Sequence, residues 1–353
     1  MRNTSLEQNP LLTRTRCGVP TGLNCIAPTR GFRPDASRTD KKRAGGWGGV
    51  DDRQNRCVHD PEEVTAPFRW DLITPDQLGS LLEGTVEPDV WFAPALVRCA
   101  GKVLARSGGG DLFFVGRSLD SMFDLLGGAL SQVPDGQVPY RLPFSFERPA
   151  VRVGAWRWRA RPLNAVEITQ ARRVLSGLDL TPQALVRRAR PATFVDVVAR
   201  GSTFTELFTL LRDWIERERA PWATVRKKIR CVGVTSRTKT SPNTFRWQQH
   251  ADWTRRLPAR SVVNVSLQPE VWSYLANHQT KLTRSYRPER WLAEVEDPAR
   301  DDRTRQALAE AVALVQYGRS PQGRKTLALA IDGEPNLNQP WLRSLVRHLN
   351  TGT

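Results

Sequence analysis

The sequence lacks an apolar run long enough to span a membrane, and no apolar stretch near its first residues has the form of a secretory signal. Cysteine is also scarce, and no two of the five thiols form a CxxC pair. An odd number of thiols without such pairs argues against both a zinc module and a disulfide framework. These absences predict a cytoplasmic protein whose cysteines are plain thiols, at Cys17, Cys25, Cys57, Cys99 and Cys231.

Histidine is represented by only four residues, and none of them stands at a spacing typical of metal ligands. The sequence also contains no Ser-His-Asp or Cys-His arrangement and no GxxxxGKS or GxxxxGKT loop. We therefore expect no metal ligands among its side chains, no nucleophilic triad and no Walker-type nucleotide site.

Acidic residues are few relative to basic ones, which gives a net charge of +17 and a pI near 10.6. Residues 1–65 hold 11 Lys and Arg against 8 Asp and Glu, so an excess of 14 positive charges lies in the rest of the chain. This balance favours anionic partners: nucleic acid, nucleotides, phosphates or an acidic surface. Because no apolar run is long enough to span a membrane, no membrane partner is expected. An Arg-rich proteome would produce the same balance without any such partner.

The composition changes along the chain. Residues 1–65 show no sustained period and are rich in Thr, Arg, Pro, Gly and Asn, which predicts a disordered leader. From there to residue 278, predicted strands alternate with helical stretches, which favours an α/β core with a mostly parallel open sheet. Residues 279–353 are predicted to form a helical C-terminal region and a candidate lid. The strands that carry this prediction span residues 111–115, 191–199, 229–235 and 260–267.

The best site signature is Phe194-Val-Asp-Val-Val-Ala-Arg-Gly-Ser-Thr203, in which a buried strand runs into a short polar loop and then a helix. Thr203 is predicted to be the N-cap of that helix, and Glu206 three residues on would complete a capping box. Gly201 would let the backbone approach a ligand closely.

Other residues of the same segment add chemistry to this loop. Ser202 and Thr203 offer hydroxyl donors, Arg200 offers a fixed charge, and the helix start offers unpaired N–H groups. Asp196 is expected at the end of the strand, where a ligand hydroxyl could pair with it. The segment therefore predicts a phosphate cradle at the carboxyl end of a strand, and its alternative is a capped helix without any ligand.

A second loop has the same plan. In Phe113-Phe-Val-Gly-Arg-Ser-Leu-Asp120 a strand ends in Gly116, Arg117 and Ser118 before a helix begins. The Arg117 guanidinium could bind a diphosphate with two parallel hydrogen bonds. Alone, such a tripeptide usually indicates an ordinary turn. It supports a phosphate-binding site here because it precedes the Gly-Ser-Thr loop in the sequence.

Together these motifs resemble those of the type I phosphoribosyltransferases over about residues 88–275. Asp196 matches the second acid of the family's signature, and Val195 stands where the first acid is expected. The loop that holds the 5-phosphate is matched by Ala199, Arg200, Gly201, Ser202 and Thr203, and the loop that holds the diphosphate by Gly116, Arg117 and Ser118.

The resemblance implies phosphoribosyl diphosphate (PRPP) or a phosphoribosyl nucleotide as ligand, normally with Mg²⁺, and transfer of the phosphoribosyl group with release of pyrophosphate. Asp196 would hold the ribose hydroxyls and Arg117 the diphosphate, as the candidate catalytic residues. A homodimer is one arrangement open to such a protein. Because Val195 departs from the signature, the alternatives are a nucleotide sensor of the same fold and a basic nucleic-acid-binding protein.

Residues 140–161 are predicted to form two strands, the second running from Val151 to Arg161 with a bulge near Gly154. In the family a mobile hairpin closes over the diphosphate, and the candidates for its basic residue are Arg157, Arg159 and Arg161. Two alternatives are an Arg/Trp surface that stacks on nucleobases and a solvated amphipathic hairpin. Residues 277–291 are predicted to be a basic surface link to the C-terminal helices. The alternative is an extended anion-binding surface made by Lys281, Arg284, Arg287 and Arg290.

Overall fold

A computed structural model describes the chain over most of its length. The described residues, from Phe68 onward, belong to one compact unit, and the predicted disordered leader, residues 1–65, lies outside the described residues. No helix in the described part is long and apolar enough to cross a membrane. The described residues are 68–73, 75–134, 136–154, 156, 158–237, 246–291 and 298–351.

The centre of the fold is a five-stranded sheet in which all neighbouring strands are parallel, in the order β2-β1-β5-β6-β7. This confirms the predicted α/β class with a mostly parallel sheet, and each of the four strands predicted for it is present. The strands are β1 (Asp111–Val115), β2 (Pro139–Leu142), β5 (Ala192–Val197), β6 (Ile229–Ser236) and β7 (Val262–Leu267).

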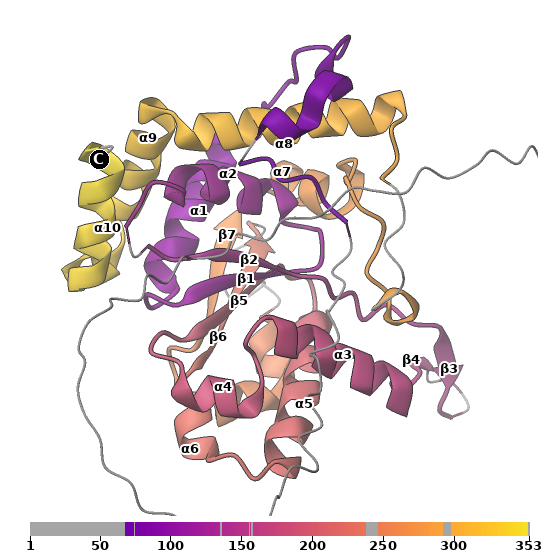
Figure 1. Cartoon of the computed structure of the whole chain (residues 1–353). Coiled ribbons are helices and arrows are strands. Elements are labelled where there is room, and N and C mark those ends of the chain that lie inside the picture. Colours follow the sequence, from indigo (N-terminus) through magenta and orange to yellow (C-terminus); the bar gives the residue numbers. More distant parts are fainter. Residues whose placement is uncertain are drawn as a thin grey trace, which may run out of the picture. The chain divides into compact units, whose positions relative to one another are not determined.

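Helices cover both faces of this sheet (Figure 1). Successive strand side chains point to opposite faces, so Phe113 packs in one buried cluster and Phe114 in the other. The cluster of Phe114 includes α1 (Ala93–Arg106), α2 (Asp120–Leu130), α9 (Pro321–Asp332) and α10 (Pro340–Thr351). The cluster of Phe113 includes α3 (Ala165–Gly177), α4 (Pro182–Arg187), α5 (Ser202–Arg217) and α6 (Trp222–Val225).

The remaining elements are short apart from α8 (Asp302–Arg319), which lies along α2. They are the 3-10 helices η1 (Pro75–Leu82), η2 (Trp247–His250), η3 (Asp252–Arg256), η5 (Pro288–Arg290) and η6 (Pro335–Asn338), the helix α7 (Pro269–Ser273), and the π-helical turn η4 (Tyr274–His278).

Two glycines allow α8 to approach α2 closely. A Cβ atom at Gly128 would lie 2.1 Å from the carbonyl oxygen of Val315, and one at Gly318 would lie 2.1 Å from that of Leu125. No side chain fits at such separations, so the two backbones touch. Glycine usually weakens a helix, and here it joins the C-terminal region to the core.

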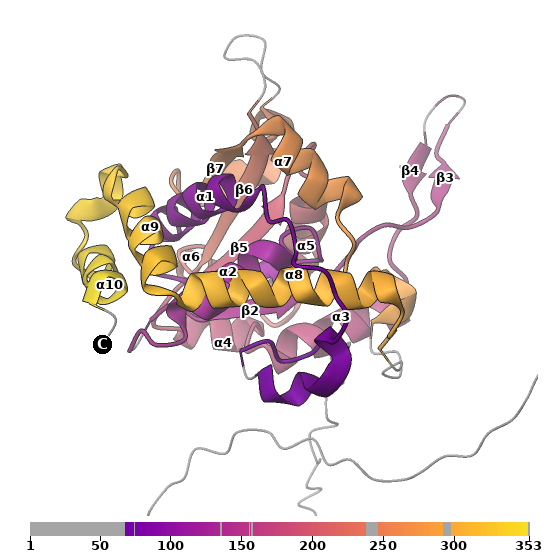
Figure 2. The same ribbon diagram turned by 90° about the horizontal axis from the view of Figure 1, so that it is seen from above.

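The prediction of two strands over residues 140–161 is wrong in part. The first strand exists as β2 but belongs to the main sheet, whereas the second segment folds back on itself as a hairpin. Its strands are β3 (Ala150–Arg152) and β4 (Trp158–Ala160). Gly154 lies between the two strands. The bulge predicted near Gly154 is therefore the place where the chain reverses direction. Figure 2 shows the hairpin standing away from the sheet and its helices.

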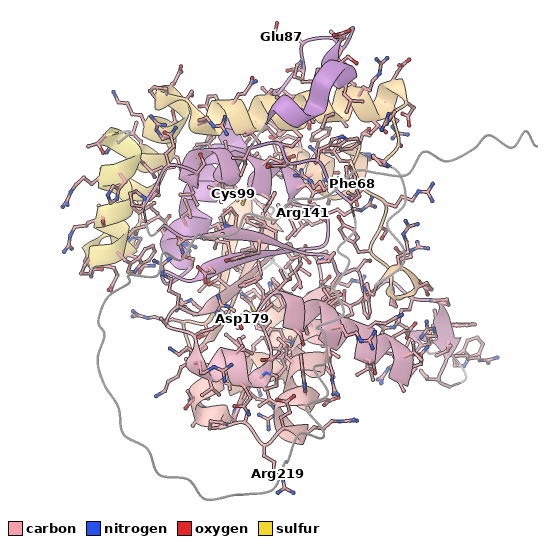
Figure 3. All side chains as sticks on the ribbon, in the orientation of Figure 1. Phe68, Glu87, Cys99, Arg141, Asp179 and Arg219 are labelled. Atoms are coloured by element: carbon pink, nitrogen blue, oxygen red, sulfur yellow. The ribbon has the colours of Figure 1, made fainter. Side chains whose placement is uncertain are left out.

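The cysteines that the structure describes are the plain thiols that the sequence predicts. Cys99 in α1 (Figure 3) and Cys231 in β6 are both buried and free. Burial disfavours the thiolate and raises the pKa of Cys99 to about 12, so this thiol is a weak nucleophile. Cys17, Cys25 and Cys57 lie outside the described residues.

Candidate functional site

The order of the strands determines where a ligand site is expected. After β1 the chain adds β2 on one side, and it then returns to place β5 on the other side of β1. The connections that leave β1 and β5 therefore diverge, which opens a crevice at the carboxyl ends of these two strands. A cavity of about 260 Å³ lies there, lined by Val115, Gly116, Arg117, Ser118, Phe144, Ser145, Asp196, Thr203, Ala276, Asn277, Gln279, Lys281, Ser285 and Tyr286.

The structure brings parts of both predicted loops to this cavity. Five of the nine predicted site residues line it: Gly116, Arg117, Ser118, Asp196 and Thr203. The other four do not line it. Of these, Gly201 is buried behind the loop, and three are exposed to solvent: Ala199, Arg200 and Ser202.

Gly116 shapes the first loop. Its φ of +71° is a left-handed conformation that side chains disfavour, and a Cβ atom there would lie 3.0 Å from the carbonyl oxygen of Phe144. The Gly116 N–H still bonds the carbonyl oxygen of Leu142 at 2.9 Å, so the β1–β2 pairing continues to the last residue before the loop. The loop thus turns sharply at the floor of the cavity.

Gly201 shapes the second loop, and the predicted capping box is wrong. Helix α5 begins at Ser202 with Gly201 as its N-cap at a φ of +77°, and no side chain caps it. A Cβ atom at Gly201 would lie 2.3 Å from the ring of Trp247, so only glycine fits. The predicted box partner, Glu206, instead forms an ion pair with Arg148 at 3.0 Å.

Thr203, freed from the capping role, hydrogen-bonds the Asp196 carboxyl group with its side chain. Asp196 is 5% exposed, and its Oδ1 also accepts a hydrogen bond from the Val197 N–H at 2.7 Å. Burial outweighs these two bonds and raises the pKa of Asp196 to about 8. At neutral pH this carboxyl group is therefore protonated, and it can donate as well as accept a hydrogen bond.

Alternation along β5 explains why only one acid reaches the cavity. Val195 is fully buried and packs on the opposite face of the sheet, among the side chains of α1 and α2. A carboxylate at that position would lie in an apolar core without a partner. Val195, which stands where the family signature has its first acid, is thus a core residue in this fold.

The third wall of the cavity comes from a segment for which the sequence favoured a surface link over an anion-binding surface. Residues 276–286 follow α7 and cross the carboxyl edge of the sheet. They begin in the π-helical turn η4, a form found frequently at functional sites. In the sequence, the basic residues of this segment were the one feature that indicated a binding role. The segment does not follow a strand-loop-helix pattern, so no motif marked it as part of the site.

Lys281 is the cation that this segment adds to the cavity. Its Nζ donates to the carbonyl oxygen of Ser118 at 3.3 Å and to Oε1 of Gln279 at 2.5 Å. Burial lowers the pKa of Lys281 to about 8, although the nearby negative charge of Asp120 acts to raise it. An incoming anion would favour the charged form of this amine.

Arg117 lies beside Lys281 and holds the same segment. Its guanidinium donates a hydrogen bond to the carbonyl oxygen of Thr283, and burial lowers its pKa, although not far enough to remove its charge. With Lys281 it gives the cavity two cations against one carboxyl group, Asp196, among the lining residues. The lining of the cavity therefore holds more basic than acidic side chains.

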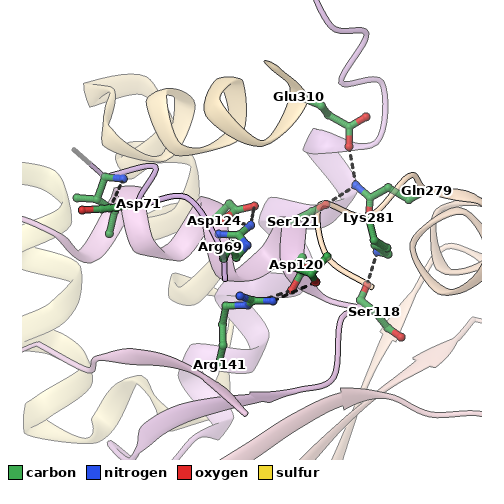
Figure 4. Close-up of polar contacts among 12 residues, drawn as sticks. Arg69, Asp71, Ser118, Asp120, Ser121, Asp124, Arg141, Gln279, Lys281 and Glu310 are labelled. Carbon is green, nitrogen blue, oxygen red and sulfur yellow. Dashed lines mark hydrogen bonds and ion pairs between the residues drawn. The ribbon is translucent and has the colours of Figure 1, made fainter. Parts of the chain in front are cut away.

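Behind the cavity lies a network of buried charges (Figure 4). Arg69 binds both oxygens of Asp124 at 2.7 Å, and burial nevertheless raises the pKa of Asp124 to about 6. Asp120 opens helix α2, where a negative charge is favourable, and lies 3.5 Å from Nε of Arg141. Neither oxygen of Asp120 accepts a hydrogen bond from a described residue. The network fixes the start of α2 directly after the Gly116 loop.

Two of the three arginines predicted to close over the cavity are described by the structure, and neither lines it. Arg159 is exposed on β4. Arg161 is held by Glu167, to whose Oε2 it donates at 2.7 Å. Arg157 lies outside the described residues.

The site combines two turns at the ends of adjacent strands, the hydroxyls of Ser118 and Thr203, two cations and one buried carboxyl group. This set of groups suits a ligand that carries both negative charge and hydroxyls. No group of three or more His, Cys, Asp or Glu side chains in the described residues could hold a metal ion. The chain matches no family model, and no curated protein or solved structure matches it.

Proposed function

We propose that the protein binds PRPP or a phosphoribosyl nucleotide in the cavity between β1 and β5. One observation carries the proposal: two loops predicted separately from the sequence, after Val115 and after Asp196, meet at a single cavity at the switch point of the sheet.

Each part of such a ligand has a matching group. Thr203, in the first turn of α5, would receive the 5-phosphate with its hydroxyl and backbone N–H, because the first turn of a helix carries unpaired N–H groups and partial positive charge. Asp196 would pair with ribose hydroxyls. Arg117 and Lys281 would neutralise the diphosphate, with the backbone of the Gly116 loop beside it.

Mg²⁺ belongs to the proposal only as an ion that arrives with the diphosphate. Mg²⁺ is commonly bound by one or two carboxylates together with substrate phosphates, and the cavity offers the single carboxyl group of Asp196. The residues present fit this arrangement once Asp196 is ionised, and they do not form a site for the ion alone. The ion would reduce the charge of the leaving diphosphate.

Transfer of the phosphoribosyl group would require that these residues stabilise a cationic sugar and a departing diphosphate. Lys281 and Arg117 are placed to do so, while Asp196 is the one acid near the sugar. With a single acid, the same cavity would also serve a sensor that binds the nucleotide without turnover. Release of pyrophosphate from bound PRPP, measured with candidate acceptors, separates an enzyme from a sensor.

The direct test is calorimetric titration of PRPP with Mg²⁺ into the wild type and a Thr203→Val variant. The substitution keeps the shape of the side chain and removes its hydroxyl. Loss of one hydrogen bond to a charged ligand should weaken binding by roughly tenfold or more. The matched control is Thr209→Val on the exposed side of the same helix, where the hydroxyl bonds only the Thr205 carbonyl oxygen.

Three results are informative. Binding that Thr203→Val weakens and Thr209→Val does not would support the proposal. Equal affinity in all three proteins would place the ligand elsewhere. Absence of PRPP binding to the folded wild type would refute the proposed ligand.

A further inference from the structure

The β3–β4 hairpin exposes large apolar side chains without packing them on the protein. Trp156 is 93% exposed and Trp158 66%, and Val153 at the turn is 50% exposed. Both views show this hairpin projecting from the rest of the unit (Figures 1 and 2). A tryptophan in solvent gains nothing for folding, so two of them on one projecting hairpin indicate a surface that another molecule covers.

Each face of the hairpin combines an arginine with an apolar side chain. Arg152 stands directly opposite Trp158 across the ribbon, and Val151 stands opposite Arg159. Residues that are directly opposite in an antiparallel pair share a face, so a guanidinium group and an apolar group lie side by side on both faces. This is a mixed surface of positive charge and aromatic or aliphatic area.

The charge of the hairpin has one sign. Residues 150–160 contain three arginines and no acidic residue. The neighbouring arginines at its base are neutralised, because Arg148 pairs with Glu206 and Arg161 with Glu167. The positive charge of the projecting part is therefore not balanced within residues 150–160.

We infer that residues 150–160 form an arm that binds single-stranded nucleic acid. The positive charge of the hairpin favours a polyanion as the partner. The exposed indole rings favour a polyanion whose flat aromatic bases are free to stack on them. In a duplex the bases are already stacked, so Trp156 and Trp158 would find no partner. A single strand offers phosphates to Arg159 together with open bases. The inference is independent of the ligand proposed for the cavity.

The chain links this arm to the cavity. Phe144 and Ser145 line the cavity, and β3 begins five residues later at Ala150. Ser145 is fixed there, because its N–H donates to the carbonyl oxygen of Tyr286 at 2.8 Å. A short segment of chain thus joins the arm to the wall of the cavity.

The test measures fluorescence anisotropy of a labelled oligothymidylate and an oligouridylate, titrated with the full chain. Each probe has about 20 nucleotides, longer than the site of a single arm. A Trp156→Ala/Trp158→Ala variant should bind at least about tenfold more weakly, since stacking on one aromatic side chain is worth about that factor. The matched control is Val166→Ala/Leu329→Ala, which removes apolar side chains that are 65% and 64% exposed elsewhere.

Salt dependence gives an independent measure. An Arg159→Gln variant should make the negative slope of log affinity against log salt shallower by about 0.7, the loss of one phosphate contact to a single strand. Wild-type affinity in the tryptophan variant would overturn the inference. So would a preference for duplex, or binding of phosphatidylserine vesicles through the tryptophans with no oligonucleotide bound.

Discussion

Replacement of Asp196 by asparagine should change how stability depends on pH. The unfolded chain releases the Asp196 proton near pH 3.8, whereas the folded chain keeps it until about pH 8. Between these values the unfolded state binds fewer protons, so this carboxyl group lowers the free energy of unfolding as the pH rises. Each pH unit contributes at most about 1.4 kcal/mol, which gives an upper bound of about 4 kcal/mol between pH 4 and pH 7.

The side-chain amide introduced by Asp196→Asn cannot ionise, yet its oxygen can still accept the hydrogen bond from the Val197 N–H. The variant should therefore gain stability relative to the wild type as the pH rises, by up to about 4 kcal/mol at pH 7. Urea denaturation of both proteins at pH 4, 5, 6 and 7, followed by circular dichroism, measures the difference. Groups shared by the two proteins, including Asp124 and Lys281, cancel in that difference.

Asp332→Asn is the matched control, because this carboxylate is exposed at the end of α9. The stability difference between this control and the wild type should vary little over the same range. If the Asp196→Asn difference is equally flat, the carboxyl group is ionised in the folded protein and the argument from burial fails. A difference that grows in the opposite direction would mean that Asp196 is stabilised as a carboxylate.

Three further predictions concern the Gly201 loop, the contact between α8 and α2, and the charge of Lys281. Gly201→Ala should destabilise the protein by about 2 kcal/mol or more, because φ is +77° and the new Cβ would meet Trp247 at 2.3 Å; unchanged denaturation midpoints would contradict this. Gly318→Ala should cost a similar amount by pushing α8 from α2, and a wild-type melting temperature would refute the close contact. PRPP affinity should fall between pH 7 and pH 9 as Lys281 loses its proton, and calorimetry on Lys281→Gln should show a smaller fall.

The Gly-Ser-Thr segment shows what a local pattern can and cannot predict. The buried strand, the polar loop and the following helix all exist, because each follows from hydrophobic runs and turn residues within about 25 positions. The capping box failed because Gly201 ends the loop two residues earlier than Thr203. Trp247, distant in the sequence, packs against Gly201 and requires that turn.

The hairpin gives the same lesson at longer range. Alternation of apolar residues over 151–161 correctly indicated extended chain, but it could not tell one bulged strand from two strands that pair with each other. The location of β2 in the main sheet was also not readable, because the neighbours of a strand depend on the packing of the whole sheet.

The sequence by itself determined the α/β class, the five strands of the sheet although not the place of β2 in it, and the two loops at Gly116 and Gly201, because periodicity and turn chemistry are local. Only the tertiary structure decided that these loops share a cavity. That depends on the placement of β5 beside β1, which brings their carboxyl ends together. It also decided the protonation of Asp196 and the role of Lys281, since burial and contacts between distant segments appear only when the chain has folded.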